Sequence, residues 1–189
     1  MASKAFGCVG NTIRLRSGLY LDLANPKPDQ FTFADIAGGL AKICRFGGQC
    51  EFFYSVAEHS YHCAIVAMED GLPVKSQIGL LLHDAAEAFL GDVVKPLKIM
   101  LPDYSVTELV MEDCIANKFG LDSPIHEIRE IDQAMLIAER KRMFSHHNVT
   151  WAGENEVRHL NVEFKWWDYR YAEMMFVTRA RSLGVNVSS

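Results

Sequence analysis

Residues 80–92 constrain the fold of this chain more than any other stretch. They read Leu-Leu-Leu-His-Asp-Ala-Ala-Glu-Ala-Phe-Leu-Gly-Asp, an apolar run that then brings together His83, Asp84 and Glu87. In a helix, Glu87 follows His83 by four residues and Asp84 by three, so the three side chains share one helix surface. Ionisable side chains are seldom fully buried unless they are paired or bind a metal. The run therefore predicts a helix whose ionisable groups meet a cation or a strong partner. The alternative is a helix end that turns toward solvent.

Helix signals dominate the rest of the chain. Ser55 and Glu58 form the capping-box pattern, in which each side chain bonds the other residue's backbone. Ser123-Pro124 is typical of a helix start, whereas Gly91 and Gly120 are typical of helix ends. We expect helices over the ranges 33–44, 55–68, 74–90, 105–119, 123–144 and 164–182. Between them we expect a turn at 25–30, an irregular connection from Pro96 to Pro102 and a surface loop at 145–163.

These segments predict the fold class. At least six helices with little strand indicate an all-α fold, a helical bundle of at least six helices. A short N-terminal β-hairpin is also expected, because apolar residues alternate on both sides of Ser17-Gly18. A chain of 189 residues is long enough for one domain with a substantial core. We therefore expect a single domain over 1–189 with its core at 31–145.

Composition and charge exclude several classes of function. The net charge is −5 and the pI is near 5.8, which argues against a basic face for duplex nucleic acid. No apolar run approaches the roughly 20 residues of a membrane-spanning helix, and the first residues do not resemble a signal peptide. The five cysteines include no Cys-x-x-Cys pair, so neither a disulfide framework nor a zinc ribbon is indicated. We expect a cytoplasmic protein with no nucleic-acid partner and no membrane partner.

Asp132 is the next candidate site residue. Its neighbours one helical turn away are Ile128 and Met135, which places the carboxylate on or beside the apolar face of its helix. Solvated aspartates usually lie opposite such a face. A buried aspartate needs a partner, and His83 and Asp84 on another helix offer one.

His59 completes a possible metal site. It lies in the first turns of the capped helix, beside apolar residues. Four ligands would then come from three helices: His59, His83, Asp84 and Asp132. Two imidazoles and two carboxylates suit one divalent transition metal with open positions for water, for example zinc, cobalt or manganese. An open position is typical of a catalytic site, because bound water becomes a source of hydroxide near neutral pH.

Four sequence blocks carry a resemblance to a known family. They are Arg45-Phe46-Gly47-Gly48, Tyr54-Ser55-Val56-Ala57-Glu58-His59-Ser60, Leu82-His83-Asp84-Ala85-Ala86-Glu87-Ala88 and Gly91-Asp92. Their order and spacing resemble the HD-domain metal-dependent phosphohydrolases, in the subgroup of small nucleotide-cleaving members. That subgroup includes bacterial 5′-deoxynucleotidases and phage dATP triphosphohydrolases. The resemblance covers about residues 31–140.

The resemblance implies a role for each matching residue. The metal ligands would be His59, His83, Asp84 and Asp132, and the catalytic residues would be Glu87, Arg45 and Asp84. Glu87 would orient or deprotonate the attacking water, and Arg45 would hold a phosphate oxygen. Asp92 would face the sugar, and Phe46 stands where the family often has tryptophan. A magnesium-type ion on the phosphates is a further expected cofactor.

Lys95 and Lys98 follow these blocks and bear on the substrate. They could neutralise the extra charge of a triphosphate, or they could be an ordinary solvated pair. The lysines and the resemblance favour a deoxynucleotide substrate, first a dNTP such as dATP, cleaved by a triphosphohydrolase in a bacterial or phage-infected cytosol. The alternative is a 5′-deoxynucleotidase that acts on dNMPs.

Two functions of other classes remain open. An HD-type di-iron oxygenase needs further histidine ligands, commonly one turn after the His-Asp pair, where this chain has Glu87. A non-catalytic nucleotide-binding module has no need of a proton-transfer residue. Trp166-Trp167 in the expected last helix suggests a core position or a subunit contact, and we expect a homo-oligomer.

Several other polar residues have simpler explanations than a place in the site. His62 is expected to pack between helices or line the pocket rim, although a fifth ligand is the alternative. Glu139 could support the ligands from behind, but a salt bridge with Lys141 or Arg142 is the simpler expectation. His146-His147 is expected in a loop or at a helix end, because adjacent residues do not share a helix face. Cys63 and Cys114 are expected to pack as small apolar residues.

Overall fold

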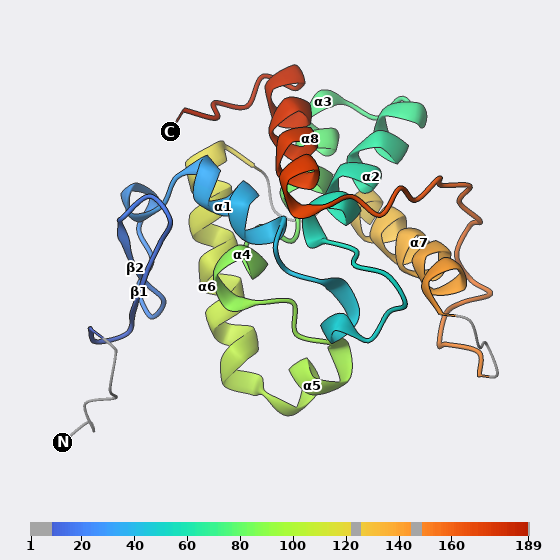
Figure 1. Ribbon diagram of the computed structural model, residues 1–189, viewed down its shortest axis with the longest axis horizontal. Coiled ribbons are helices and arrows are strands. Elements are labelled where there is room, and N and C mark those ends of the chain that lie inside the picture. The colour runs from blue at the N-terminus through green and yellow to red at the C-terminus, as the bar shows by residue number, and fades with distance from the viewer. Residues whose placement is uncertain (1–8, 122–125, 145–148, 189) are drawn as a thin grey trace.

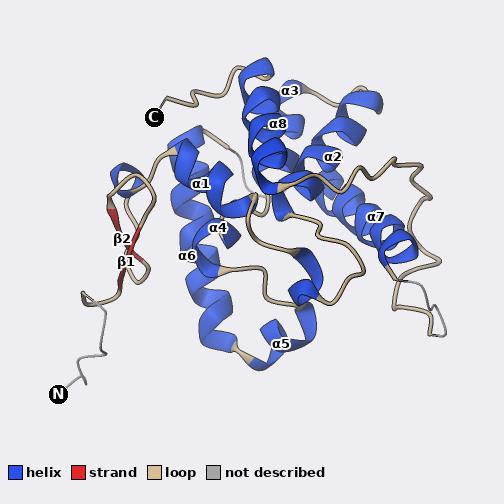
Figure 2. Ribbon diagram, in the orientation of Figure 1, coloured by secondary structure: helices blue, strands red, loops and turns tan. Residues whose placement is uncertain are grey.

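The computed structural model describes residues 9–121, 126–144 and 149–188, and it is mostly helical (Figures 1 and 2). The α-helices of these residues are α1 (Phe33–Leu40), α2 (Val56–Glu69), α3 (Val74–Leu82), α4 (Glu87–Leu90), α5 (Lys95–Met100), α6 (Pro102–Phe119), α7 (His126–Met143) and α8 (Tyr169–Ser182). Two short 3-10 segments, η1 (Pro28–Gln30) and η2 (Arg45–Gly48), lie before and after α1. The prediction of an all-α fold is confirmed.

The predicted hairpin is also present. β1 (Thr12–Arg14) pairs antiparallel with β2 (Tyr20–Asp22), and Ile13 lies opposite Leu21. Gly18 has a φ of +92°, a value that favours glycine, and this allows the tight reversal between the strands. Leu21 is fully buried, so one side of the hairpin belongs to the apolar core.

Two clusters of buried apolar side chains hold the helices together. The first joins α1, α6 and α8, with Phe33 stacked on Phe176 at 5.8 Å between ring centroids. The second joins α2, α3, α7 and the segment before α8, around Tyr54, Leu80 and Met135. Helix α2 contributes to both clusters, so it is buried on two faces. In Figure 1 it lies between α8 and α7, in the half of the molecule away from the hairpin.

The helix predicted over 74–90 is wrong in one respect, because it is interrupted at 83–86 between α3 and α4. The ring nitrogen Nδ1 of His83 lies 2.7 Å from the carbonyl oxygen of Leu80, where it competes with the backbone for that acceptor. The N–H groups of Ala85 and Glu87 then bond carbonyl oxygens three residues back, at 3.0 Å each. This tighter turn replaces the regular helix at the His-Asp pair.

Three other predicted boundaries need correction. Helix α1 ends at Leu40 rather than at 44, because the following backbone pairs with residues 54–56, where Arg45 N bonds the carbonyl oxygen of Tyr54 at 2.9 Å. The connection predicted to be irregular contains α5, since Pro96 lies in its first turn, where proline is tolerated. Helix α8 begins at Tyr169 rather than at 164, because Asp168 caps it.

The start of α6 also differs, because the helix predicted from 105 begins at Pro102, where proline is tolerated in the first turn, and the other boundaries agree within the described residues. Gly120 ends α6 with a left-handed backbone, and residues 149–163 form no helix or strand. The predicted start at Ser123-Pro124 and the pair His146-His147 lie outside the described residues. Among the helices described, none combines the length and the apolar character needed to cross a membrane.

The buried carboxylate of Asp35 gives a first testable prediction. It accepts hydrogen bonds from Ser17 N at 2.8 Å, Thr32 N at 2.9 Å and Thr32 Oγ1 at 2.8 Å. Burial alone would raise its pKa, but these hydrogen bonds hold the pKa below the usual value. In Asp35→Asn, the new NH2 group faces an N–H donor of Ser17 or Thr32 and cannot accept its hydrogen bond. The substitution should therefore lower the free energy of unfolding at pH 7 by about 1–3 kcal/mol.

The pH dependence follows from the direction of this shift. A pKa that is lower in the folded state contributes stability above about pH 4, and this contribution is lost as the pH falls through the folded-state pKa. Urea unfolding should therefore show a difference between Asp35→Asn and the native chain that shrinks from pH 7 to pH 3. Asp29→Asn, at an exposed position, is the matched control. An equal difference at both pH values would contradict the prediction.

Candidate metal centre

Helix α2 supplies the most deeply buried ligand, His59. The helix begins as predicted, with the Ser55 hydroxyl oxygen accepting the Glu58 N–H at 3.1 Å. The ring of His59 is fully buried. A buried imidazole requires partners for both nitrogens, and each of them faces ionisable groups.

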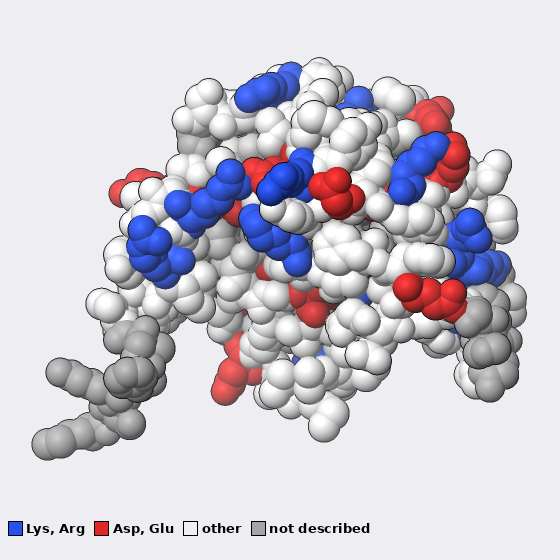
Figure 3. All heavy atoms as spheres, in the orientation of Figure 1, with Lys and Arg blue, Asp and Glu red and all other residues white. Residues whose placement is uncertain are grey.

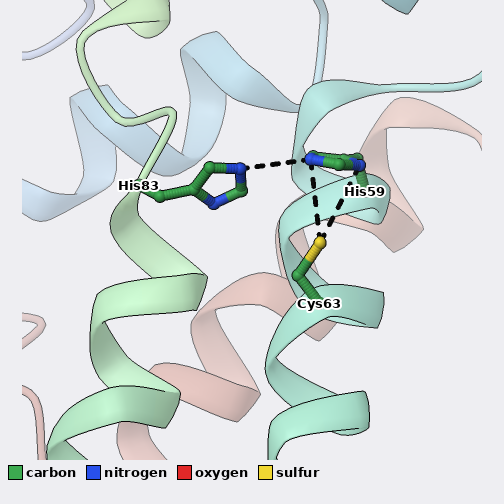
Figure 4. A group of neighbouring side chains, drawn as sticks. All are labelled: His59, Cys63 and His83. Carbon is green, nitrogen blue, oxygen red and sulfur yellow. Dashed lines mark hydrogen bonds between the residues drawn. The ribbon is translucent and has the colours of Figure 1, made fainter. Parts of the chain in front are cut away.

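The structure brings the four predicted ligands together. His59 Nε2 lies 3.2 Å from His83 Nε2, 3.5 Å from Asp84 Oδ2 and 3.3 Å from Asp132 Oδ1. His83 Nε2 lies 3.2 Å from Asp84 Oδ2 and 3.6 Å from Asp132 Oδ1. Figure 4 shows the two imidazoles pointing toward each other from neighbouring elements. The four side chains come from α2, from the 83–86 turn and from α7.

These distances fit a single divalent ion. Two ligand atoms about 2.1 Å from one ion at tetrahedral angles are about 3.4 Å apart, close to the five distances given above. Burial alone would lower the pKa of His83, but Asp84 and Asp132 hold it well above its usual range. Burial alone would raise the pKa of Asp84, whereas His83 and His59 bring it to about 2. The four groups thus attract protons and cations to one point, where a metal would replace protons.

Cys63, which the sequence predicts to pack as a small apolar residue, is a further ligand candidate. Within the described residues, potential ligand atoms of His59, Cys63 and His83 all lie within 4.8 Å of one another. Its sulfur lies 3.7 Å from His59 Nε2 and 4.0 Å from Nδ1. Figure 4 shows the His59 ring edge-on with the sulfur to one side of the ring plane. The sulfur is nearly equidistant from the two ring nitrogens, so it lies beside the ring face and away from the direction of the Nε2 lone pair, which makes the carboxylates the better ligands.

Arg45 and Glu139 support the ligands from behind. Glu139 is fully buried, and its Oε1 lies 2.5 Å from His59 Nδ1. Its Oε2 accepts from Arg45 Nε at 3.1 Å, and Arg45 Nη1 lies 3.4 Å from Asp84 Oδ2. The expected salt bridge of Glu139 with Lys141 or Arg142 is therefore wrong. Glu139 follows Asp132 by seven residues, which places the two side chains on one side of α7, and this spacing is the sequence feature that indicates a place for Glu139 behind the ligands.

Glu87 lies next to this group and is 5% exposed. Burial raises its pKa to about 9, helped by the charges of Asp84 and Asp92. One oxygen, Oε1, lies 3.4 Å from Lys98 Nζ, and the other is buried with no hydrogen-bond partner among the described residues. Glu87 can therefore keep a proton near neutral pH, which suits proton transfer.

The two lysines differ in their surroundings. Lys98 is not a solvated side chain, because its Nζ lies 2.6 Å from Glu108 Oε1 as well as near Glu87. Lys95 is exposed.

Phe46 and Asp92, the predicted base and sugar contacts, also lie near the site. Phe46 packs edge-on against Phe144 at 5.3 Å between ring centroids, and the Arg45 guanidinium lies 5.5 Å from its ring. Asp92 is half-buried, and burial raises its pKa. Phe46 thus provides an apolar wall beside the positive charge of Arg45.

Glu58 and His62 connect α2 to the segment before α8. Instead of closing the predicted capping box, the Glu58 carboxylate accepts from Lys165 N at 3.2 Å and from Trp167 N at 3.0 Å. His62 lies 3.6 Å from Glu58 Oε1, and its ring is 5.5 Å from that of Trp167. The expectation that His62 packs between elements is confirmed. Trp166-Trp167 precede α8 instead of lying within it.

The two ligand sets give a second prediction. Asp132→Asn should weaken cobalt binding about tenfold or more, because a neutral amide is a poorer ligand than a carboxylate. Cys63→Ser should change it by less than about threefold, because the sulfur lies beside the His59 ring face and not beyond the Nε2 lone pair. Titration of metal-free protein with cobalt, followed by its absorption spectrum, measures both. A thiolate-to-cobalt charge-transfer band lost in Cys63→Ser would instead assign the sulfur as a ligand.

Comparisons with known proteins place the chain in a family. No protein-family model matches it. It is 40% identical over 89 residues to the uncharacterized protein RCAP_rcc00048 of Rhodobacter capsulatus, a match that covers 45% of each chain. It is 35% identical over 130 residues to the uncharacterized protein YfdR of Escherichia coli K12, which covers 68% of this chain and 70% of that protein. The chain therefore belongs to the same protein family as Escherichia coli YfdR.

Proposed function

We propose that the protein is a metal-dependent phosphohydrolase of deoxynucleotides, in the manner of the HD-domain enzymes that its sequence blocks resemble. The observation that carries this proposal is the convergence of His59, His83, Asp84 and Asp132 on one point beside Arg45 and Glu87. Metal ligands, the buried guanidinium group of Arg45 and the carboxyl group of Glu87 are together the parts that phosphate hydrolysis requires.

The proposed cofactor is one divalent ion, of which zinc, cobalt and manganese accept this ligand mixture. His59, His83, Asp84 and Asp132 would hold it. When bound, such an ion polarises a phosphate oxygen and lowers the pKa of coordinated water. A second, magnesium-type ion on the phosphates remains part of the proposal for a triphosphate substrate.

The protein's own groups have distinct roles in the proposed reaction. Arg45 is 8% exposed and keeps N–H groups beyond those directed at Glu139 and Asp84, so it can bind a phosphate oxygen. Glu87 holds or transfers the proton at its unpartnered oxygen. Asp92 would accept a hydrogen bond from the sugar 3′-hydroxyl, and Phe46 would contact the base.

Two substrates compete within this proposal. A dNTP such as dATP is the first candidate, from the resemblance to the phage enzymes. The pairing of Lys98 with Glu87 and Glu108 favours the alternative, a dNMP, because that lysine's charge is already matched by carboxylates. Charge on a triphosphate would then be met by Arg45, by Lys95 and by metal ions.

The other classes of function find less support. A second iron would need more histidine ligands, and the ring of His62, one turn along α2 from His59, contacts Glu58 and Trp167. A non-catalytic binding module would not need a buried carboxyl such as Glu87 beside the ligands. On the face shown in Figure 3, a short run of Lys and Arg side chains over the left and centre is bordered by acidic side chains.

The predicted homo-oligomer stays a prediction. Trp166 stacks on Phe52 at 4.6 Å between centroids, and Trp167 packs on Tyr61 at 5.0 Å, so both tryptophans have partners within the chain. They therefore no longer argue for a subunit contact. Sedimentation velocity of the purified chain at several concentrations measures the state directly, and a single species of about 21 kDa would contradict the prediction.

Product analysis tests the proposed function. Metal-free protein is reloaded with cobalt, manganese or zinc and incubated with dAMP, dGMP, dATP, dGTP and the matching ribonucleotides, and the products are separated by ion exchange. We expect deoxynucleoside from dATP. Glu87→Gln should lower kcat by about 100-fold or more, because it loses the proton-transfer group. Glu130→Gln, whose side chain is 51% exposed on α7, is the matched control.

Each outcome of that experiment has a distinct meaning. Deoxynucleoside from dATP but not from dAMP establishes a triphosphohydrolase, and deoxynucleoside from dAMP alone establishes a 5′-deoxynucleotidase. No hydrolysis with any metal, or full activity in both Glu87→Gln and Asp132→Ala, would overturn the proposed function.

A further inference from the structure

The carboxylate of Glu139 divides its two oxygens between two functional side chains. Oε1 lies 2.5 Å from His59 Nδ1, on α2. Oε2 lies 3.1 Å from Arg45 Nε and 3.1 Å from Nη2, in η2. Glu139 itself is fully buried on α7, so neither oxygen has water as a substitute partner. The three side chains form one buried network that spans three elements.

On the histidine side, this contact decides which nitrogen carries hydrogen. An ionised carboxylate oxygen only accepts hydrogen bonds, so Nδ1 of His59 must be the N–H donor. In the neutral ring the lone pair is then on Nε2, which is the nitrogen directed at His83 and Asp132. Glu139 thus selects the tautomer of His59 that can bind a metal at the ligand cluster.

On the arginine side, the same carboxylate fixes the guanidinium plane. Contacts from Nε and Nη2 to one oxygen hold one edge of the group, and Nη1 is left 3.4 Å from Asp84 Oδ2. The charge of Glu139 also offsets the cost of burying Arg45. Orientation of the proposed phosphate-binding group therefore depends on Glu139.

We propose that Glu139 is a positioning residue that couples the metal ligand His59 to the phosphate-binding Arg45. This inference rests on the proposed metal-dependent function and deepens it. A carboxylate can accept hydrogen bonds from both partners at once. The fixed orientation of Arg45 and the His59 tautomer with a free Nε2 lone pair therefore occur in the same state of the protein. The site is then preorganised on both sides by one residue that touches neither metal nor substrate.

Glutamine at this position cannot serve both partners. If its amide oxygen faces His59, its NH2 group meets the N–H donors of Arg45. If the oxygen faces Arg45, the NH2 group meets Nδ1, and the ring hydrogen must move to Nε2, where it blocks metal binding. Glu139→Gln should therefore bind cobalt about 10–100-fold more weakly than the native chain.

The coupling is tested by a double-mutant cycle with Arg45→Met, read out as cobalt affinity by isothermal titration. Without the guanidinium, the amide oxygen of Gln is free to accept from His59. The double variant should then bind cobalt within about fivefold of Arg45→Met alone, whereas Glu139→Gln alone loses about 10–100-fold. Glu130→Gln on the same helix is the control, and thermal unfolding reports whether each variant is folded. Equal losses in both backgrounds would overturn the proposal.

Nitrogen NMR of the zinc-loaded native chain gives a test that needs no variant to fold. We expect His59 to show a protonated Nδ1 and a metal-bound Nε2. A metal-bound Nδ1 would overturn the inference. If the native chain binds neither cobalt nor zinc, the proposed function fails. If it binds both while Glu139→Gln keeps full affinity, the metal centre stands and the positioning role fails.

Discussion

The fold depends on pairing the ionisable groups that it buries along α2. His59 and Glu58 are fully buried on neighbouring positions of that helix, and each would be costly without a partner. Glu58 binds the backbone of the segment before α8, and His59 binds Glu139 on α7. These two connections tie distant parts of the chain to one central helix. Apolar burial holds the helices together, and the buried polar contacts set how they are aligned.

The same connections give the candidate site its shape. His83 and Asp84 lie in the tight turn that follows α3 rather than in a regular helix, and their polar atoms reach the His59 ring from there, while Asp132 reaches it from α7. A site assembled from the ends and faces of packed helices has little freedom to rearrange. Its imidazoles and carboxylates converge on one point, where a divalent cation would bind in place of protons.

The sequence predicted the composition of the site better than its local geometry. Motif blocks selected His59, His83 and Asp84, and helix periodicity placed Asp132 near the apolar face of its helix. Periodicity could not show the break at 83–86, because it arises from competition between a side chain and the backbone for the Leu80 carbonyl oxygen. The role of Glu139 was also hidden, because a nearby lysine and arginine offered simpler partners in sequence. Its true partners are 80 and 94 residues away.

Glu58 illustrates why such tertiary choices escape local patterns. A serine followed three residues later by glutamate predicts a capping box, and the serine half forms. The Glu58 carboxylate instead accepts hydrogen bonds from the N–H groups of Lys165 and Trp167. These two residues flank Trp166, which has a φ of +55°. A positive φ at a bulky residue is costly and persists only where surrounding contacts determine it. The buried carboxylate supplies two of those contacts, so the local pattern gives way to a long-range one that offsets backbone strain.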